Sequence, residues 1–114
     1  MASYISHTTV DCRDAYALSV WWSAVLDYHE DPNDPNLPGH EECMIYSPDA
    51  SHRVLFIEVP EAKVAKNRLH FDLRAPGAVA DEVARLRALG ATVVRVGDAL
   101  TVMRDPEGNE FCVE

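Results

Sequence analysis

The chain has 114 residues, of which 47% are hydrophobic and 25% are charged, and its formal net charge at pH 7 is -9. This length suits one compact domain or two very small halves that share a core, and the hydrophobic fraction argues against a disordered chain. The acidic balance argues against nucleic acid and against an anionic membrane surface as partners, because both attract basic proteins.

The N-terminal segment and the cysteines both bear on where the protein is located. The N-terminal residues lack the basic start and apolar segment of a signal peptide, and no apolar run is long enough to span a bilayer. The three cysteines Cys12, Cys43 and Cys112 show no paired spacing, which is typical of reduced thiols. We therefore expect a cytoplasmic protein with no membrane partner.

The first half begins with a predicted strand and helix. Alternating residues over Tyr4–Cys12 indicate a strand, and Asp14 is suited to cap the helix that follows. Apolar residues recur at helical spacing and extend the predicted helix through Tyr28. They are Ala15, Leu18, Trp22, Val25 and Leu26.

In the rest of the first half, the sequence pattern predicts a loop followed by two strands. Three prolines and a glycine break regular structure over His29–Gly39. Strands are expected over Glu42–Tyr46 and Arg53–Val59. The charged connector Pro60–Lys66 is the best candidate for a seam between two halves.

The second half opens with the clearest strand pattern in the chain, over Lys66–Arg74. A strand has a side-chain period of two, so this pattern predicts one apolar and one charged face. The apolar face consists of Leu69, Phe71 and Leu73. On the charged face, His70 and Asp72 lie two residues apart, which is a suitable arrangement for the wall of a polar cleft.

The remaining pattern predicts a helix followed by three strands. Pro76-Gly77 opens a helix with Val79, Val83, Leu86 and Leu89 on one face, and Gly90 ends it. Ala91–Val96 and Ala99–Arg104 form a predicted hairpin. After a tight turn at Asp105–Asn109, a last strand is predicted over Glu110–Glu114.

Each half therefore has the order strand, helix, strands, which is an internal repeat of architecture and places the chain in the α+β class. A unit of this kind leaves one face of its sheet bare. Two such units are expected to bury surface against each other, and often against a second chain.

Several stretches carry a resemblance to a known family. They are Asp11-Cys12-Arg13-Asp14 before a helix with Trp21-Trp22, Val59 to Lys63 with Lys66 to Leu73, Leu89-Gly90-Ala91-Thr92-Val93, and Asp105 to Cys112. Through them the chain resembles the vicinal oxygen chelate superfamily, which includes glyoxalase I, fosfomycin- and bleomycin-resistance proteins and extradiol dioxygenases. It is most similar to the small glyoxalase-like domain proteins of that superfamily.

The resemblance implies a single glyoxalase-like domain over residues 1–114, built of two βαβββ modules at residues 1–60 and 61–114. Eight strands are expected to curl into a cupped mixed sheet with the helices on the outside. The resemblance also implies a site for a small-molecule ligand in the cup, and a homodimer.

The resemblance further implies a set of metal ligands, carried over by position. They are His7, Glu58, His70 and Cys112, where relatives usually have glutamate at the last position. Such a set suits zinc, whereas nickel, cobalt, manganese or iron would prefer the imidazole and carboxylate groups without the thiolate. Glu110 and Glu114 share a strand face with Cys112, so either could supply the metal-binding carboxylate instead, and Glu110 is also the candidate catalytic residue.

Each candidate ligand also has a purely structural interpretation. The two histidines are equally typical of a wet, polar cleft, the carboxylate of Glu58 of an exposed surface, and Cys112 of a small buried hydrophobe. These alternatives remain open at the level of sequence.

Two functions from different classes follow. The first is a divalent-metal-dependent lyase or isomerase of the glyoxalase type. The second is a metal-free protein that sequesters a small molecule, as bleomycin-resistance proteins do, and a non-catalytic accessory domain is a third. For the ligand-binding cleft we expect Trp22, Tyr46, Phe56 and Asp72, which together with the acidic loop would suit a cationic or aromatic ligand.

Overall fold

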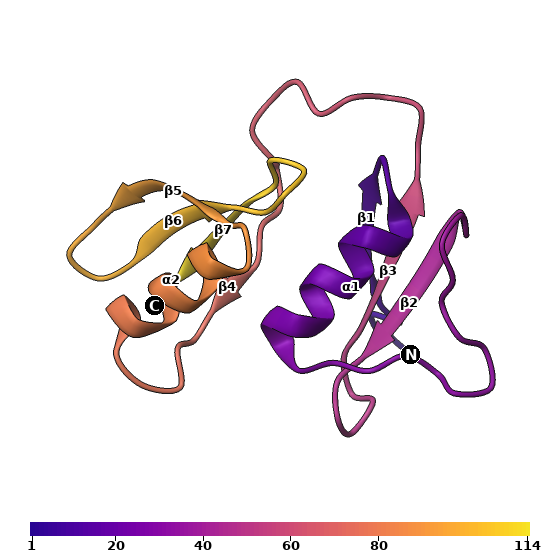
Figure 1. The fold of residues 1–114 in the computed structure, drawn as a ribbon. Coiled ribbons are helices and arrows are strands. Elements are labelled where there is room, and N and C mark those ends of the chain that lie inside the picture. The colour runs from indigo at the N-terminus through magenta and orange to yellow at the C-terminus, as the bar shows by residue number, and fades with distance from the viewer. The chain divides into compact units, whose positions relative to one another are not determined.

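The computed structural model describes all residues 1–114 and divides the chain into two compact units, residues 1–62 and 63–114. Each unit has one helix and one sheet, so the predicted α+β class is confirmed (Figure 1). Neither helix combines the length and apolar character that crossing a membrane requires.

The first unit has the order β1 (Thr8–Cys12), α1 (Ala15–Leu26), β2 (Glu42–Tyr46) and β3 (Arg53–Glu58). Its sheet has the order β1-β3-β2, with β3 parallel to β1 and antiparallel to β2. The unit therefore contains three strands, one fewer than the βαβββ repeat has.

Helix α1 begins where the sequence predicts. The Asp14 carboxylate accepts a hydrogen bond from the Ala17 backbone N–H at 3.0 Å, and the helix packs on one face of the sheet. The side chains between helix and sheet form the core of this unit. They are Cys12, Ala15, Leu18, Trp22, Val25, Cys43, Ile45, Val54 and Phe56.

The second unit has the order β4 (Asp72–Leu73), α2 (Val79–Ala88), β5 (Thr92–Val96), β6 (Thr101–Arg104) and β7 (Glu110–Val113). The sheet order is β4-β7-β6-β5, with β4 parallel to β7 and the other pairs antiparallel. The buried residues of this unit are Leu86, Ala91, Thr101, Met103, Asp105, Glu110, Phe111, Cys112 and Val113.

The two strands expected to be longest are shorter than predicted. Instead of Lys66–Arg74, only Asp72–Leu73 is strand, and Leu69 is 88% exposed rather than part of a buried apolar face. At the start of this segment, the Asn67 backbone N–H donates to Glu110 Oε1 at 2.9 Å rather than to a neighbouring strand. Similarly, β1 begins at Thr8 rather than Tyr4.

The charges divide unevenly between the units. Eight of the ten Lys and Arg residues lie in residues 63–114, where eight acidic residues balance them. The net charge of -9 therefore comes entirely from the first unit, and the second unit is neutral as a whole.

Candidate metal centre

The second sheet aligns four side chains in a row across its strands. Asp72 on β4 is opposite Cys112 on β7, Cys112 is opposite Val102 on β6, and Val102 is opposite Arg95 on β5. Residues directly opposite each other on neighbouring strands share a face of the sheet. An acid, a thiol, an apolar side chain and a guanidinium thus occupy one face.

His70 joins this row at its acidic end. Its Nε2 atom lies 3.2 Å from Asp72 Oδ1, and one ligand atom from each of His70, Asp72 and Cys112 lies within 4.8 Å of the others. Cys112 is buried and the other two are exposed. The three groups form one cluster with an open side toward solvent.

The thiol of Cys112 is held in its protonated form. Burial is the main reason that its pKa is raised, and the Asp72 carboxylate adds to this through its charge and a hydrogen bond. The positive charges of Lys66 and Arg95 act in the opposite direction. A thiol with a raised pKa is a poor nucleophile, which argues against covalent catalysis by Cys112.

The cluster fits a borderline divalent metal ion. Imidazole, carboxylate and thiolate are all zinc ligands, with bond lengths of about 2.0–2.3 Å, so donor atoms within 4.8 Å of one another require only small shifts to share an ion. Three protein ligands leave a fourth position open, as in catalytic rather than structural zinc sites.

The first unit does not bring His7 and Glu58 together. His7 precedes Thr8, which pairs with Val54, whereas Glu58 pairs with Cys12 at the far end of the same strand pair. At the rise of extended backbone, the five positions from His7 to Cys12 correspond to about 16 Å. Neither residue joins a cluster of three potential ligands.

Two of the residues expected to line a ligand-binding cleft are core residues instead. Trp22 and Phe56 are 2% and 0% exposed, so neither side chain offers an accessible surface to a ligand. Tyr46 is half-buried and stacks on the His29 ring, with ring centroids 6.0 Å apart. The expected aromatic cleft for a cationic ligand therefore retains only Tyr46 from its aromatic set.

Glu110 is fixed in an ionic network. Its Oε2 atom lies 3.0 Å from Lys63 Nζ and 3.6 Å from Arg104 Nε, and its Oε1 atom accepts from the Asn67 backbone N–H. Burial opposes ionisation, but the bonds from Asn67 and Lys63 outweigh it, and the pKa of Glu110 is lowered to about 2. Such a carboxylate takes up almost no proton at neutral pH, which does not fit the predicted role as catalytic base.

Sequence reasoning missed the third member of the cluster and the partners of Glu110. The sequence analysis places Asp72 in the ligand-binding cleft. Its position two residues after His70 on one predicted strand face is, however, a signal that the two side chains could bind a metal together. Lys63 and Asn67 left no such signal, because they meet Glu110 only after residues 63–67 fold back onto β7.

An open pocket of about 430 Å³ lies on the second unit. Its lining joins the segment before β4, strands β5 to β7 and the turn between β6 and β7. The residues are Lys63, Val64, Ala65, Lys66, Val94, Val102, Arg104, Glu107, Gly108 and Glu110. Because Val102 is opposite Cys112 on the same face of the sheet, the pocket adjoins the cluster of His70, Asp72 and Cys112.

Comparison with known families and structures yields consistent matches. The model of the family described as "Glyoxalase-like domain" matches residues 7–114. A search of curated protein sequences gives no significant match.

Solved structures resemble the whole chain at low sequence identity. A point mutant of the fosfomycin resistance protein FosX from Listeria monocytogenes, complexed with Mn(II) and 1S,2S-dihydroxypropylphosphonic acid, has 16% identity and a TM-score of 0.74, covering 100% of this chain and 90% of that one. FosX from Mesorhizobium loti has 17% identity and a TM-score of 0.70, with coverage of 100% and 92%.

A third structure is a glyoxalase/bleomycin resistance protein/dioxygenase family enzyme from Burkholderia phytofirmans PsJN. It has 21% identity and a TM-score of 0.72, covering 95% of this chain and 94% of that chain. At such identities these likenesses establish the fold alone.

Proposed function

Because the chain belongs to the glyoxalase-like domain family, within the vicinal oxygen chelate superfamily, we propose that its second unit holds a divalent metal ion on His70, Asp72 and Cys112. The metal would serve to bind an oxygen-bearing small molecule and support lyase or isomerase chemistry on it. The observation that carries this proposal is the approach of three donor atoms to within 4.8 Å of one another.

The chemistry that the ion would supply is Lewis acidity at an open coordination position, which polarises a carbonyl or phosphoryl oxygen. The chain's own residues hold and orient the ion. Asp72 accepts from the thiol of Cys112 and lies 3.2 Å from His70, so each ligand already restrains another. FosX crystallised with Mn(II) supports a metal in this family fold, without assigning one to this chain.

The proposal selects Asp72 in place of the predicted His7 and Glu58. Those two residues lie at opposite ends of one strand pair, so they are too far apart to share an ion within their unit. The homodimer expected from the family resemblance stays a prediction, which sedimentation of the purified protein would test.

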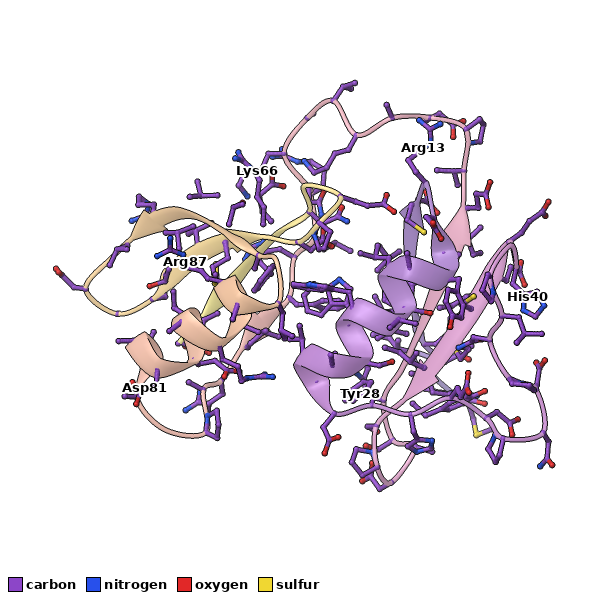
Figure 2. All side chains as sticks on the ribbon, in the orientation of Figure 1. Arg13, Tyr28, His40, Lys66, Asp81 and Arg87 are labelled. Carbon is purple, nitrogen blue, oxygen red and sulfur yellow. The ribbon has the colours of Figure 1, made fainter.

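Cobalt binding tests the metal centre directly. Untagged, chelator-treated protein is titrated with Co(II), and a thiolate-to-cobalt charge-transfer band with one ion bound per chain is the expected result. Cys112→Ser should abolish that band, and His70→Ala and Asp72→Asn should each weaken binding about 10-fold or more. His40→Ala removes an exposed histidine of the first unit (Figure 2) and should change nothing.

Two results would overturn the proposal. One is the absence of stoichiometric binding by a protein that is fully folded. The other is binding that loses equal strength in His40→Ala and His70→Ala. In either case the metal-free sequestration of a small molecule becomes the better account.

A further inference from the structure

The residues that line the pocket of the second unit include more positive than negative side chains. Three cations line it, Lys63, Lys66 and Arg104, against the two carboxylates Glu107 and Glu110. The chain as a whole carries a net charge of -9, so a surplus of positive charge in its pocket runs against the general balance.

These cations differ in how far they are already engaged. Lys63 is committed to Glu110 at 3.0 Å, and its Nζ also donates to the Ala65 carbonyl. Arg104 approaches the same Glu110 oxygen at 3.6 Å and keeps a half-exposed side chain. Lys66 makes no ion pair in the structure, so its ammonium is available to a ligand.

We propose that this pocket binds the oxyanion group, a phosphate, phosphonate or carboxylate, of a small molecule through Lys66 and Arg104. This inference deepens the proposed function by naming the substrate class, and it rests on that function only for the reaction itself. The apolar walls Val94 and Val102 then contact the remainder of the ligand. The mixture of a few charged groups with apolar walls is typical of small-molecule sites.

The position of the pocket relative to the cluster adds a second reason. Val102 lines the pocket beside Lys66, and it lies opposite Cys112 on the same face of the sheet. A ligand whose anionic group contacts Lys66 can therefore place a neighbouring oxygen toward the three ligating side chains. Binding and chemistry would occupy adjacent parts of one sheet face.

The charges that line this pocket favour an anionic ligand, whereas the sequence predicted a cationic or aromatic one. An acidic loop and aromatic residues suggested a cationic or aromatic ligand, but that loop belongs to the first unit and two of the aromatic side chains are buried. The second unit, neutral as a whole, instead presents an unpaired lysine and a weakly paired arginine in its pocket.

Phosphate binding to metal-free protein tests the inference independently of the metal. Chelator-treated protein is titrated with inorganic phosphate, methylphosphonate and acetate at millimolar concentrations, and backbone amide NMR shifts are followed. We expect saturable shifts around Lys66, Val102 and Gly108. Lys66→Gln and Arg104→Gln should each weaken affinity about 10-fold, the effect of one charge-assisted hydrogen bond.

The matched control is Arg87→Gln, which removes one positive charge from α2, whereas Lys66 precedes β4 (Figure 2). It changes the net charge as much as Lys66→Gln does, so it should leave the affinity unchanged. Equal weakening in both variants, or no saturable shift at all, would overturn the pocket assignment.

The result with metal separates this inference from the proposed function. Binding that appears only after Co(II) is added and survives in Lys66→Gln would mean that the ion alone holds the anion, which contradicts the pocket and supports the metal centre. Binding in the metal-free protein, combined with failure to bind Co(II), would support the pocket and contradict the metal centre. The three anions distinguish which oxyanion group is preferred.

Discussion

Replacing Glu110 with glutamine tests whether one buried carboxylate fixes residues 63–67 on the second sheet. The pKa of Glu110 falls from 4.5 to about 2 in the folded chain. At 1.36 kcal/mol per unit, that difference sets an upper bound of roughly 3 kcal/mol on its contribution to stability. Lys63 is partly exposed, with 24% of its side chain accessible, and screening by water reduces the expectation to about 1–2 kcal/mol.

The pH dependence of this contribution has a definite sign. A carboxyl whose folded pKa is depressed stabilises the fold fully above its unfolded pKa of 4.5 and loses that effect as the pH falls toward 2. Urea unfolding of Glu110→Gln should therefore show the full loss relative to wild type at pH 7. At about pH 3, less than half of the difference should remain.

Glu61→Gln, at an exposed position, is the matched control and should be neutral at both pH values. If Glu110→Gln is as stable as wild type at pH 7, the network with Lys63, Asn67 and Arg104 contributes nothing and the reasoning fails. A difference that is the same at pH 7 and pH 3 would show that ionisation of Glu110 is not its source.

Three further outcomes follow from the structure. Zinc binding to chelator-treated protein at pH 7 should release about one proton from Cys112, because its thiol is protonated before the ion binds. Calorimetry in two buffers of different ionisation enthalpy tests this, and the same apparent binding enthalpy in both buffers would contradict it. Leu86→Ala should lower the free energy of unfolding by about 2–5 kcal/mol in urea, because that side chain is 0% exposed, and a loss below about 1 kcal/mol would mean the site is loosely packed. Ala50→Gly should raise the free energy of unfolding by about 1 kcal/mol, because Ala50 has φ 58, a left-handed conformation that glycine adopts without strain. Thermal melts test this, and a lower melting temperature for the variant would refute it.

Local patterns in the sequence predict the elements whose causes are local. Helix α1 begins after Asp14 because a cap and a helical stripe act over neighbouring residues, and β2 occupies the predicted residues Glu42–Tyr46. The alternation over Lys66–Arg74 is just as regular, yet only two residues pair as strand. The Asn67 backbone N–H is bonded instead to Glu110, 43 positions away, and no local pattern contains that contact.

The candidate site shows the same division. His70 and Cys112 were named from the family pattern, and the structure places them in one cluster because β4 and β7 are neighbours. Asp72 was named for a different role. The pocket beside the cluster could not be predicted, since it forms only when the segment before β4 and the turn after β6 meet on one face.

The uneven division of charge has a consequence for how quickly an anion would reach the proposed binding pocket. At long range an approaching anion meets the repulsion of a molecule with a net charge of -9, and only within about one Debye length does Lys66 dominate. Added salt therefore screens the long-range barrier and speeds association, while it weakens the final contact and speeds dissociation. Because salt raises both rates, its effect on occupancy is only the difference between the two effects.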